Sequence, residues 1–440
     1  MGVVYIKLAQ MLATQNYGNL FTEQDRQALS SICDDCNPID YAEIEKILHQ
    51  EYGPDLDTIF TTIEREPVGS ASVSQVHRAV LQSGEVVAIK VRRPDISHAI
   101  ERDLARIRKI VRRFGRIFKF RNFTGSDRAL ELYLEWIHEE TDFLHEQQNI
   151  KLYQEFADNV NGKVRGTSQI KVPHLYPEYC TTNVIVMEFI LVPTINKLEL
   201  TDINKTKIVE ALNSYIRSSF WAMFNDQTIV FHGDPHSGNI CVDDRGDIYF
   251  LDMGLLCALS DEDALLCRQF FLTAYSGNAE KMYDMLVGYG DMSEKQRQAF
   301  RQDCETYCRN IQAKEVTYYF IDMMNICLKY EFVPPNFLFS IAKAFVCLNG
   351  IANFTGNQHS ARELLQEQAV EFFLRRSLDD LKEVATDSLT LIPDAISNTL
   401  ERGIASTMAK LTTNTRLHQS LKKSLNHLEE VLDLLALPAE

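Results

Sequence analysis

The chain has 440 residues, of which 45% are hydrophobic, and its 45 basic and 61 acidic side chains give a net charge of −16. This length and apolar content suffice for two or three packed units, or for one two-lobed catalytic domain with additions. The acidic balance excludes extensive binding to nucleic acid, so the phosphates of a substrate would need metal ions and local cations.

The cysteines indicate reduced thiols and a cytoplasmic setting. Ten of them are scattered through segments that look structured, and the Cys33-x-x-Cys36 pair has no second pair at zinc spacing. The most apolar window, 337–354, contains Lys343 and predicts a buried helix rather than a membrane span. We therefore expect no transmembrane helix, no secretory signal and at most peripheral membrane association.

In chain order, residues 4–50 have a helical pattern, and a linker is expected around Pro54 and Asp57. Two β-branched strands follow, at 76–81 and 86–92. The Ser83-Gly84 turn between them predicts a hairpin.

Two helices are predicted next. The first, 96–119, has an apolar stripe and a basic opposite face, which is either a solvated surface or a contact for anionic lipid or an acidic partner. The second runs from about 127 to 158 and carries the acidic side chains Glu139, Glu140, Asp142 and Glu146.

Short strands are predicted at 171–172 and 183–190, and helices dominate after Asn204. Residues 361–440 look like an all-helical appendage. Leucines at spacings of four and three between Leu421 and Leu435 favour docking on the chain's own domain, with a homodimer contact as the second interpretation.

The segment 232–252, HGDPHSGNICVDDRGDIYFLD, carries the chemistry. Strands at 240–242 and 248–251 should pair as a hairpin that brings Asp252 back beside Asn239. These two side chains offer hard oxygen ligands for Mg²⁺, and Asp234 is placed to orient or deprotonate an attacking hydroxyl. The alternative is an acidic surface hairpin that binds nothing. His232 is expected to hydrogen-bond the loop backbone rather than act as a base, and His236 is left unassigned.

Lys90 ends a Val-Ala-Ile-Lys strand, where a kinase-type lysine would reach the α- and β-phosphates of ATP, and Glu146 is its expected carboxylate partner. The expected phosphate-covering loop consists of small residues with one glycine: Gly69, Ser70, Ala71 and Ser72. Such a loop is stiffer than a glycine-rich one, so the phosphates should be held differently.

Five separated motifs, taken together, resemble the UbiB family of AarF-domain-containing, ADCK-type atypical kinases. The family's Lys-x-Gly-Gln motif resembles residues 7–10, its alanine-rich loop resembles 69–72, and its lysine falls on Lys90. Its Glu-x-Asp motif resembles 140–142 with the salt-bridge glutamate at Glu146, and its catalytic loop and metal-binding Asp fall on 232–239 and Asp252.

The resemblance implies an α+β, two-lobed kinase-like fold that binds ATP and Mg²⁺ and serves ubiquinone or other isoprenoid-lipid metabolism. It implies catalytic roles for Asp234, Lys90 and Glu146, and metal ligation by Asn239 and Asp252. Adenine would meet the hinge residues Met187, Glu188 and Ile190, and the side chains of Lys7, Gln10, Glu140 and Asp142 would roof the active site. Anionic lipid or isoprenoid-quinone precursors are the implied partners besides ATP.

We expect four segments: an N-terminal helical extension (1–62), a kinase-like N-lobe with inserted helices (63–190), a C-lobe (191–360) and the helical appendage (361–440). Three residues depart from the family pattern. Ala9 replaces a glycine, Gly69 and Ser70 replace alanines, which could alter nucleotide preference, and Met253 replaces a phenylalanine.

Two other functions fit part of this pattern. Small-molecule phosphotransferases of the aminoglycoside and choline kinase type also carry an HGDxHxxN loop and a later Asp, but do not need the pairs Lys7/Gln10 and Glu140/Asp142. A nucleotide-binding pseudokinase scaffold is the third interpretation. It is disfavoured because the chemical side chains are all present.

Overall fold

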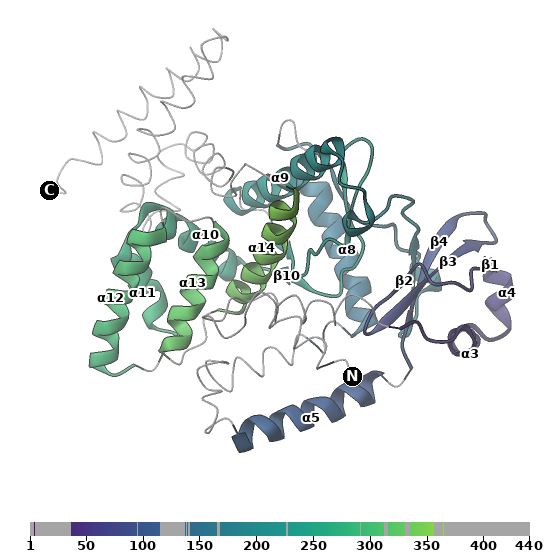
Figure 1. The fold of residues 1–440 in the computed structure, drawn as a ribbon, viewed down its shortest axis with the longest axis horizontal. Coiled ribbons are helices and arrows are strands. Elements are labelled where there is room, and N and C mark those ends of the chain that lie inside the picture. The colour runs from purple at the N-terminus through teal and green to yellow at the C-terminus, as the bar shows by residue number, and fades with distance from the viewer. Residues whose placement is uncertain are drawn as a thin grey trace, which may run out of the picture. The chain divides into compact units, whose positions relative to one another are not determined.

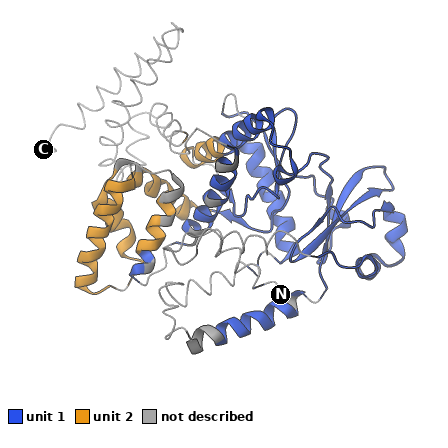
Figure 2. Cartoon of the chain, viewed as in Figure 1, with its two compact units in different colours: residues 1–215, 230–258, 327–357 blue, residues 216–229, 259–326, 358–440 orange. Residues whose placement is uncertain are grey.

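The computed structural model describes residues 4, 37–94, 96–114, 137, 139, 141–164, 168–225, 228–290, 292–311, 316–330, 335–355 and 364. The chain divides into two units (Figure 2). The first comprises residues 1–215, 230–258 and 327–357, and the second comprises residues 216–229, 259–326 and 358–440.

An antiparallel sheet opens the first unit (Figure 1). Its order is β1 (Phe60–Ile63), β3 (Ser74–Leu81), β4 (Val86–Arg92) and β6 (Val184–Glu188), with β2 (Gly69–Ser70) paired to β3. The predicted hairpin is confirmed, since β3 pairs with β4 from Ser74↔Arg92 to Val80↔Val86. Gly84 sits in its turn at φ 93°, a left-handed conformation that favours glycine.

One face of this sheet is covered by α3 (Tyr41–Tyr52) and α4 (Leu56–Ile59). Alternate β4 side chains, Val87, Ile89 and Val91, pack there against Ile44 and Leu48. The intervening side chains of β4, including Lys90, therefore point to the opposite face. The prediction of a linker around residues 54–57 is wrong, because the 3-10 turn η1 (Gly53–Asp55) leads directly into α4.

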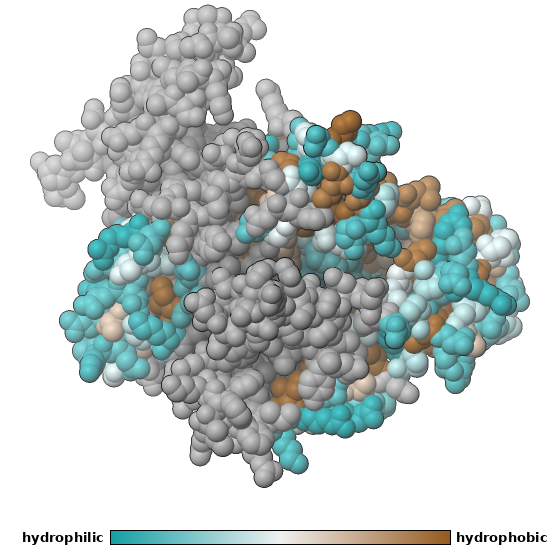
Figure 3. Space-filling model, in the orientation of Figure 1, coloured by the Kyte–Doolittle hydropathy of each residue, from teal (hydrophilic) through white to brown (hydrophobic). Residues whose placement is uncertain are grey.

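Helix α5 (Ile96–Phe114) follows the sheet, and Ile96, Ile100, Leu104 and Ile107 of its predicted apolar stripe are buried in one cluster. Its exposed side chains include Arg102, Arg106 and Lys109, and its outer edge is hydrophilic in Figure 3. These three basic side chains are therefore solvent-accessible.

The second predicted helix is not continuous from about 127 to 158. Helix α8 begins at Phe143 and ends at Val160, because Asp142 is extended (φ −93°, ψ 103°) and its carboxylate accepts from the amide of Leu144 at 2.9 Å. An aspartate caps a helix better than it continues one, and the sequence interpretation overlooked this signal.

The second half of the first unit positions the loop of the 232–252 motif. Strands β8 (Ile240–Val242) and β9 (Ile248–Phe250) form the predicted hairpin, β5 (Ile170–Lys171) adds to β9 in parallel, and β7 (Val230–His232) pairs with β10 (Leu256–Ala258). Helix α14 (Asn336–Thr355) packs on β7 and β10. The 3-10 turns η2 (Pro177–Tyr179) and η3 (Ile195–Lys197) precede α9 (Asp202–Phe224).

Four helices account for most of the described part of the second unit: α10 (Asp261–Ser276), α11 (Ala279–Val287), α12 (Glu294–Ile311) and α13 (Val316–Lys329). Phe270 stacks on Phe320 at 5.2 Å, and Phe271 meets Phe320 edge-on at 5.1 Å. Aromatic packing thus contributes to the core of this unit. In the described part of the chain, no helix combines the length and apolar character needed to cross a membrane.

Candidate active site

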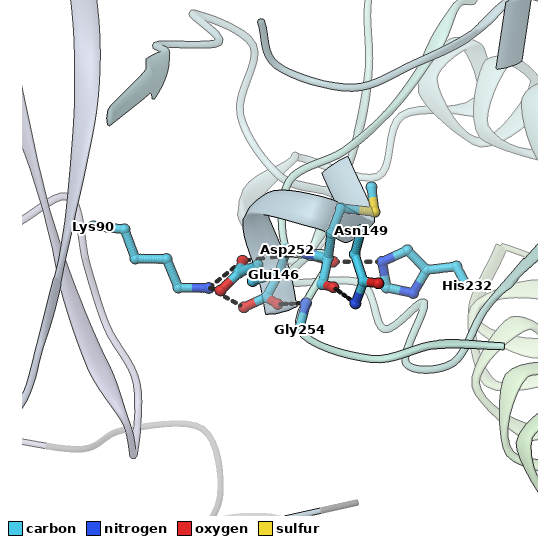
Figure 4. Close-up of polar contacts among 7 residues, drawn as sticks. Lys90, Glu146, Asn149, His232, Asp252 and Gly254 are labelled. Carbon is cyan, nitrogen blue, oxygen red and sulfur yellow. Dashed lines mark hydrogen bonds and ion pairs between the residues drawn. The ribbon is translucent and has the colours of Figure 1, made fainter. Parts of the chain in front are cut away.

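Lys90 and Glu146 form a buried ion pair at the centre of the site (Figure 4). Lys90 Nζ lies 2.6 and 2.8 Å from the two carboxylate oxygens of Glu146, and the two side chains are only 4% and 1% exposed. Asp252 Oδ2 lies 2.9 Å from the same nitrogen. Burial opposes the charged form of the lysine, but the two carboxylates outweigh it and raise the pKa of Lys90, so the lysine is charged. Burial raises the pKa of Glu146.

Helix α8 carries a second contact to this network. Glu146 Oε1 accepts from the backbone N–H of Met253 at 3.3 Å, and Asn149, three residues further along the helix, donates from Nδ2 to the Met253 oxygen at 2.8 Å. Residues three apart lie on one helical face, so both side chains reach the backbone of the same residue, Met253. Asn149 was missed in the sequence, although its spacing from Glu146 was a usable signal.

His232 holds the backbone of the loop, as the sequence predicts. Its Nδ1 accepts from the backbone N–H of Asp234 at 3.1 Å. This assigns the ring hydrogen to Nε2, which donates to the backbone oxygen of Asp252 at 2.6 Å. Burial is the main cause that lowers the pKa of His232 to about 4. The ring is therefore neutral and structural at neutral pH. Exposed His236 accepts from the Gly238 amide at 3.1 Å.

The hairpin brings Asn239 and Asp252 to the same end. The N–H of Leu251 donates to the backbone oxygen of Asn239 at 2.9 Å, so the next residue, Asp252, lies directly beside Asn239. Asp252 Oδ1 accepts from Gly254 at 2.9 Å, and the carboxylate is 35% exposed. The half-buried amide of Asn239 makes no side-chain hydrogen bond to another described residue. One carboxylate and one accessible amide oxygen fit the oxygen ligands that Mg²⁺ prefers.

Asp234 is contacted from helix α14. Its Oδ2 lies 3.2 Å from Lys343 Nζ, and its Oδ1 lies 3.6 Å from the sulfur of Cys347. Neither α14 residue was predicted as a site residue, because nothing local in the sequence connects them with the catalytic loop.

The loop of small residues is fixed by hydrogen bonds. The Ala71 amide donates to the Ser74 oxygen at 2.8 Å, and Arg93 donates to the Ala71 oxygen and to Ser70 Oγ, each at 2.8 Å. At Gly69 an added Cβ would meet nothing within 4 Å. The space around residue 69 therefore does not require a glycine. Arg93, which was not predicted as a site residue, holds the loop in place through its hydrogen bonds.

The predicted hinge lies at the end of β6. Met187 is buried and pairs with Ala88, and the amide of Glu188 donates to the His174 oxygen at 2.7 Å. The amide of Phe189 likewise donates to the Val86 oxygen, whereas the amide of Ile190 has no partner among the described residues.

The predicted roof is described in part. Lys7, Gln10 and Glu140 lie outside the described residues. Asp142 is placed at the start of α8, where its Oδ1 accepts from the amides of Leu144 and His145 at 2.9 and 3.4 Å. Its charge thus stabilises a helix N-terminus.

An antiparallel sheet with a lysine paired to a helix glutamate, followed by an HGDPHSGN loop and a hairpin ending in Asp252, defines an α+β kinase-like domain. The chain belongs to the ABC1 atypical kinase-like domain family, whose model matches residues 31–286. The expected UbiB-type kinase family is thereby confirmed.

Individual relatives are distant. The uncharacterized protein sll1770 of Synechocystis is 25% identical over 80% of this chain and 59% of its own length. The probable protein kinase UbiB of Actinobacillus pleuropneumoniae is 25% identical over 91% of this chain and 76% of its own. The chain thus spans less than two thirds of the first relative. The solved Rv3197–erythromycin complex of Mycobacterium tuberculosis has a TM-score of 0.44 at 17% identity, covering 80% of this chain and 90% of that one.

Proposed function

We propose that this chain binds Mg-ATP and catalyses phosphoryl transfer from it, to water or to an acceptor hydroxyl, as an atypical kinase or ATPase. The observation that carries the proposal is the buried network in which Lys90 contacts both Glu146 and Asp252. Purely structural ion pairs are rarely buried to this degree, because removing two charges from water costs several kcal/mol each. Nucleotide phosphates that bind together with a metal ion would require a cation and oxygen ligands for the metal. Lys90, held between two carboxylates, is such a cation, and Asp252 and the accessible Asn239 are such ligands.

Each residue has one proposed part in the reaction. Lys90 binds the α- and β-phosphates, and Glu146 orients its ammonium group. Asn239 and Asp252 would hold Mg²⁺, which when bound neutralises charge on the phosphate oxygens. Asp234 orients the nucleophile, whose oxygen bonds to the γ-phosphorus as the bond to the β–γ bridging oxygen breaks and ADP leaves with that electron pair. The nucleophile's proton passes to Asp234 or to the phosphate product.

The nucleotide base and phosphates would be held mainly by backbone. Gly69, Ser70, Ala71 and Ser72 would cover the phosphates, braced by Arg93, while adenine would meet Met187, Glu188 and Ile190. Since the amide of Glu188 already donates to His174, the amide of Ile190, which has no partner among the described residues, is the better donor to the adenine ring.

The domain and partner assignments are part of the same proposal. Residues 1–62, 63–190, 191–360 and 361–440 are the proposed extension, N-lobe, C-lobe and appendage, with Lys7, Gln10, Glu140 and Asp142 facing the active site. The exposed basic side chains of α5 favour peripheral contact with an anionic membrane surface. Such a location would suit the support of ubiquinone or other isoprenoid-lipid metabolism.

The test is ATP binding and Mg²⁺-dependent ATP hydrolysis by the full chain and by Asp252→Asn. We expect turnover in the wild type and a loss of at least about 100-fold in the variant, because the metal would lose its charged ligand. Nucleotide binding without turnover in the wild type would instead favour a scaffold. Stimulation by anionic vesicles or isoprenoid-quinone precursors would support the lipid assignment, and indifference to both would leave a generic nucleotide hydrolase.

A further inference from the structure

Helix α14 reaches the catalytic loop from a distant part of the sequence. It packs on β7 and β10, the two strands that flank the segment carrying Asp234. Lys343 and Cys347 are four residues apart on this helix and so lie on one face. Both side chains contact the Asp234 carboxylate, the lysine at Oδ2 and the thiol at Oδ1.

The two contacts differ in kind. Lys343 Nζ is 3.2 Å from Oδ2, and the two side chains are 26% and 22% exposed, so the attraction is only partly screened by water. The Cys347 sulfur, 3.6 Å from Oδ1, is a weak donor. Burial raises the pKa of this thiol, which therefore keeps its proton. Together they engage both oxygens of one carboxylate and fix its orientation.

The catalytic loop has no cation of its own beside Asp234. Residues 232–239 read HGDPHSGN and contain neither lysine nor arginine. A carboxylate with an ammonium group at this distance favours its ionised form and accepts a proton less readily. Such a group is better suited to orienting a nucleophile than to keeping the nucleophile's proton.

We propose that Lys343 is a positioning residue for phosphoryl transfer, which holds the Asp234 carboxylate ionised and oriented, with Cys347 fixing its second oxygen. This inference rests on the proposed function. It makes α14 part of the catalytic machinery, and it assigns Asp234 chiefly to alignment of the nucleophile, with the released proton leaving on the phosphate product.

The experiment compares Lys343→Ala, Lys343→Arg and Cys347→Ala with a matched control, Lys171→Ala. Lys171 is 28% exposed and lies 2.6 Å from Asp247, so its removal deletes a similar ion pair away from Asp234. In Lys343→Ala we expect kcat for ATP to fall on the order of 10- to 100-fold, with the affinity for ADP unchanged, because misalignment affects the reaction and not nucleotide binding. The acidic limb of the pH–rate profile should move to higher pH. Lys343→Arg should restore most of kcat, and Cys347→Ala should cost about 3-fold.

A second readout does not depend on turnover. Carbon-13 NMR of labelled aspartate carboxyls, with Asp234 assigned through Asp234→Asn, should show its titration midpoint rising in Lys343→Ala and unchanged in Lys171→Ala. An unchanged midpoint, or a kcat and pH profile equal to those of Lys171→Ala, would overturn the inference. A wild-type chain that binds nucleotide without hydrolysing it would overturn the phosphotransferase proposal instead, and the carboxyl titration would still decide whether Lys343 acts on Asp234.

Discussion

His232 joins the two aspartates of the site through their backbones. Its Nε2–H donates to the Asp252 oxygen at 2.6 Å while Nδ1 accepts from the Asp234 amide at 3.1 Å. The ring also stacks on Phe250, with centroids 5.0 Å apart. Only the neutral tautomer satisfies both hydrogen bonds, so the protonation state of one buried ring is coupled to the geometry of the catalytic loop.

The first prediction concerns acid stability. The pKa of His232 is about 4 in the folded chain, against an ordinary value of 6.5, so the unfolded chain binds a proton at higher pH. The stability from the neutral ring is present above pH 6.5 and is lost as the pH falls towards 4. Between pH 7.5 and 5 we expect a loss of about 2 kcal/mol.

Denaturant unfolding of the wild type and of His232→Phe at both pH values measures this effect. The phenylalanine keeps the ring stacking and cannot be protonated, so its stability should change less between the two pH values. Equal changes in the two proteins would show that His232 does not contribute.

The second prediction concerns the buried pair. Glu146→Gln removes one of the two anions around Lys90 and leaves the lysine with Asp252. We expect a loss of unfolding free energy of about 2–4 kcal/mol, because a buried charge loses a partner, and weaker ATP binding. Glu64→Gln is the control, since its pair with Arg78 is exposed and should be worth at most about 1 kcal/mol. Similar losses in both variants would contradict the role of burial.

The third prediction concerns Asn149. In Asn149→Ala the buried oxygen of Met253 loses its 2.8 Å donor, and we expect destabilisation of about 1–3 kcal/mol. Because Met253 follows Asp252, ATP hydrolysis should also fall. Gln154→Ala on the same helix, which removes only a solvent-exposed hydrogen bond to Asp158 of 2.9 Å, should change neither thermal stability nor hydrolysis. An Asn149→Ala protein with wild-type hydrolysis would exclude this residue from the site.

The fourth prediction concerns the phosphate-covering loop. Gly69→Ala adds a Cβ that meets nothing within 4 Å, so the fold should be unaffected or stabilised by up to about 1 kcal/mol through a less flexible unfolded chain. If glycine at position 69, where the family pattern has alanine, tunes nucleotide preference, the ratio of ATP affinity to ADP affinity should change in this variant. Calorimetric titration with both nucleotides measures the ratio, and a constant ratio would show that this glycine is neutral.

Some features followed from local patterns alone. The β3–β4 and β8–β9 hairpins were predictable because β-branched strands flank short turns with glycine, at Gly84 and Gly246. Turn geometry and strand pairing are set by neighbours in the chain, and the sequence shows them directly. The break before α8 was missed because Asp142 stands in an acidic run and was interpreted as a residue of a continuous helix that faces the active site, rather than as a cap.

The order of the motifs, the candidate aspartates and Lys90 as the candidate phosphate-binding lysine could all be predicted from the amino-acid sequence alone. Which groups contact one another is seen only in the folded chain: Lys90 lies between Glu146 and Asp252, Asn149 donates to Met253, and Lys343 lies against Asp234. These contacts join segments far apart in the chain. Their strength depends on burial and distance, which arise only when strands and helices pack, so no local pattern encodes them.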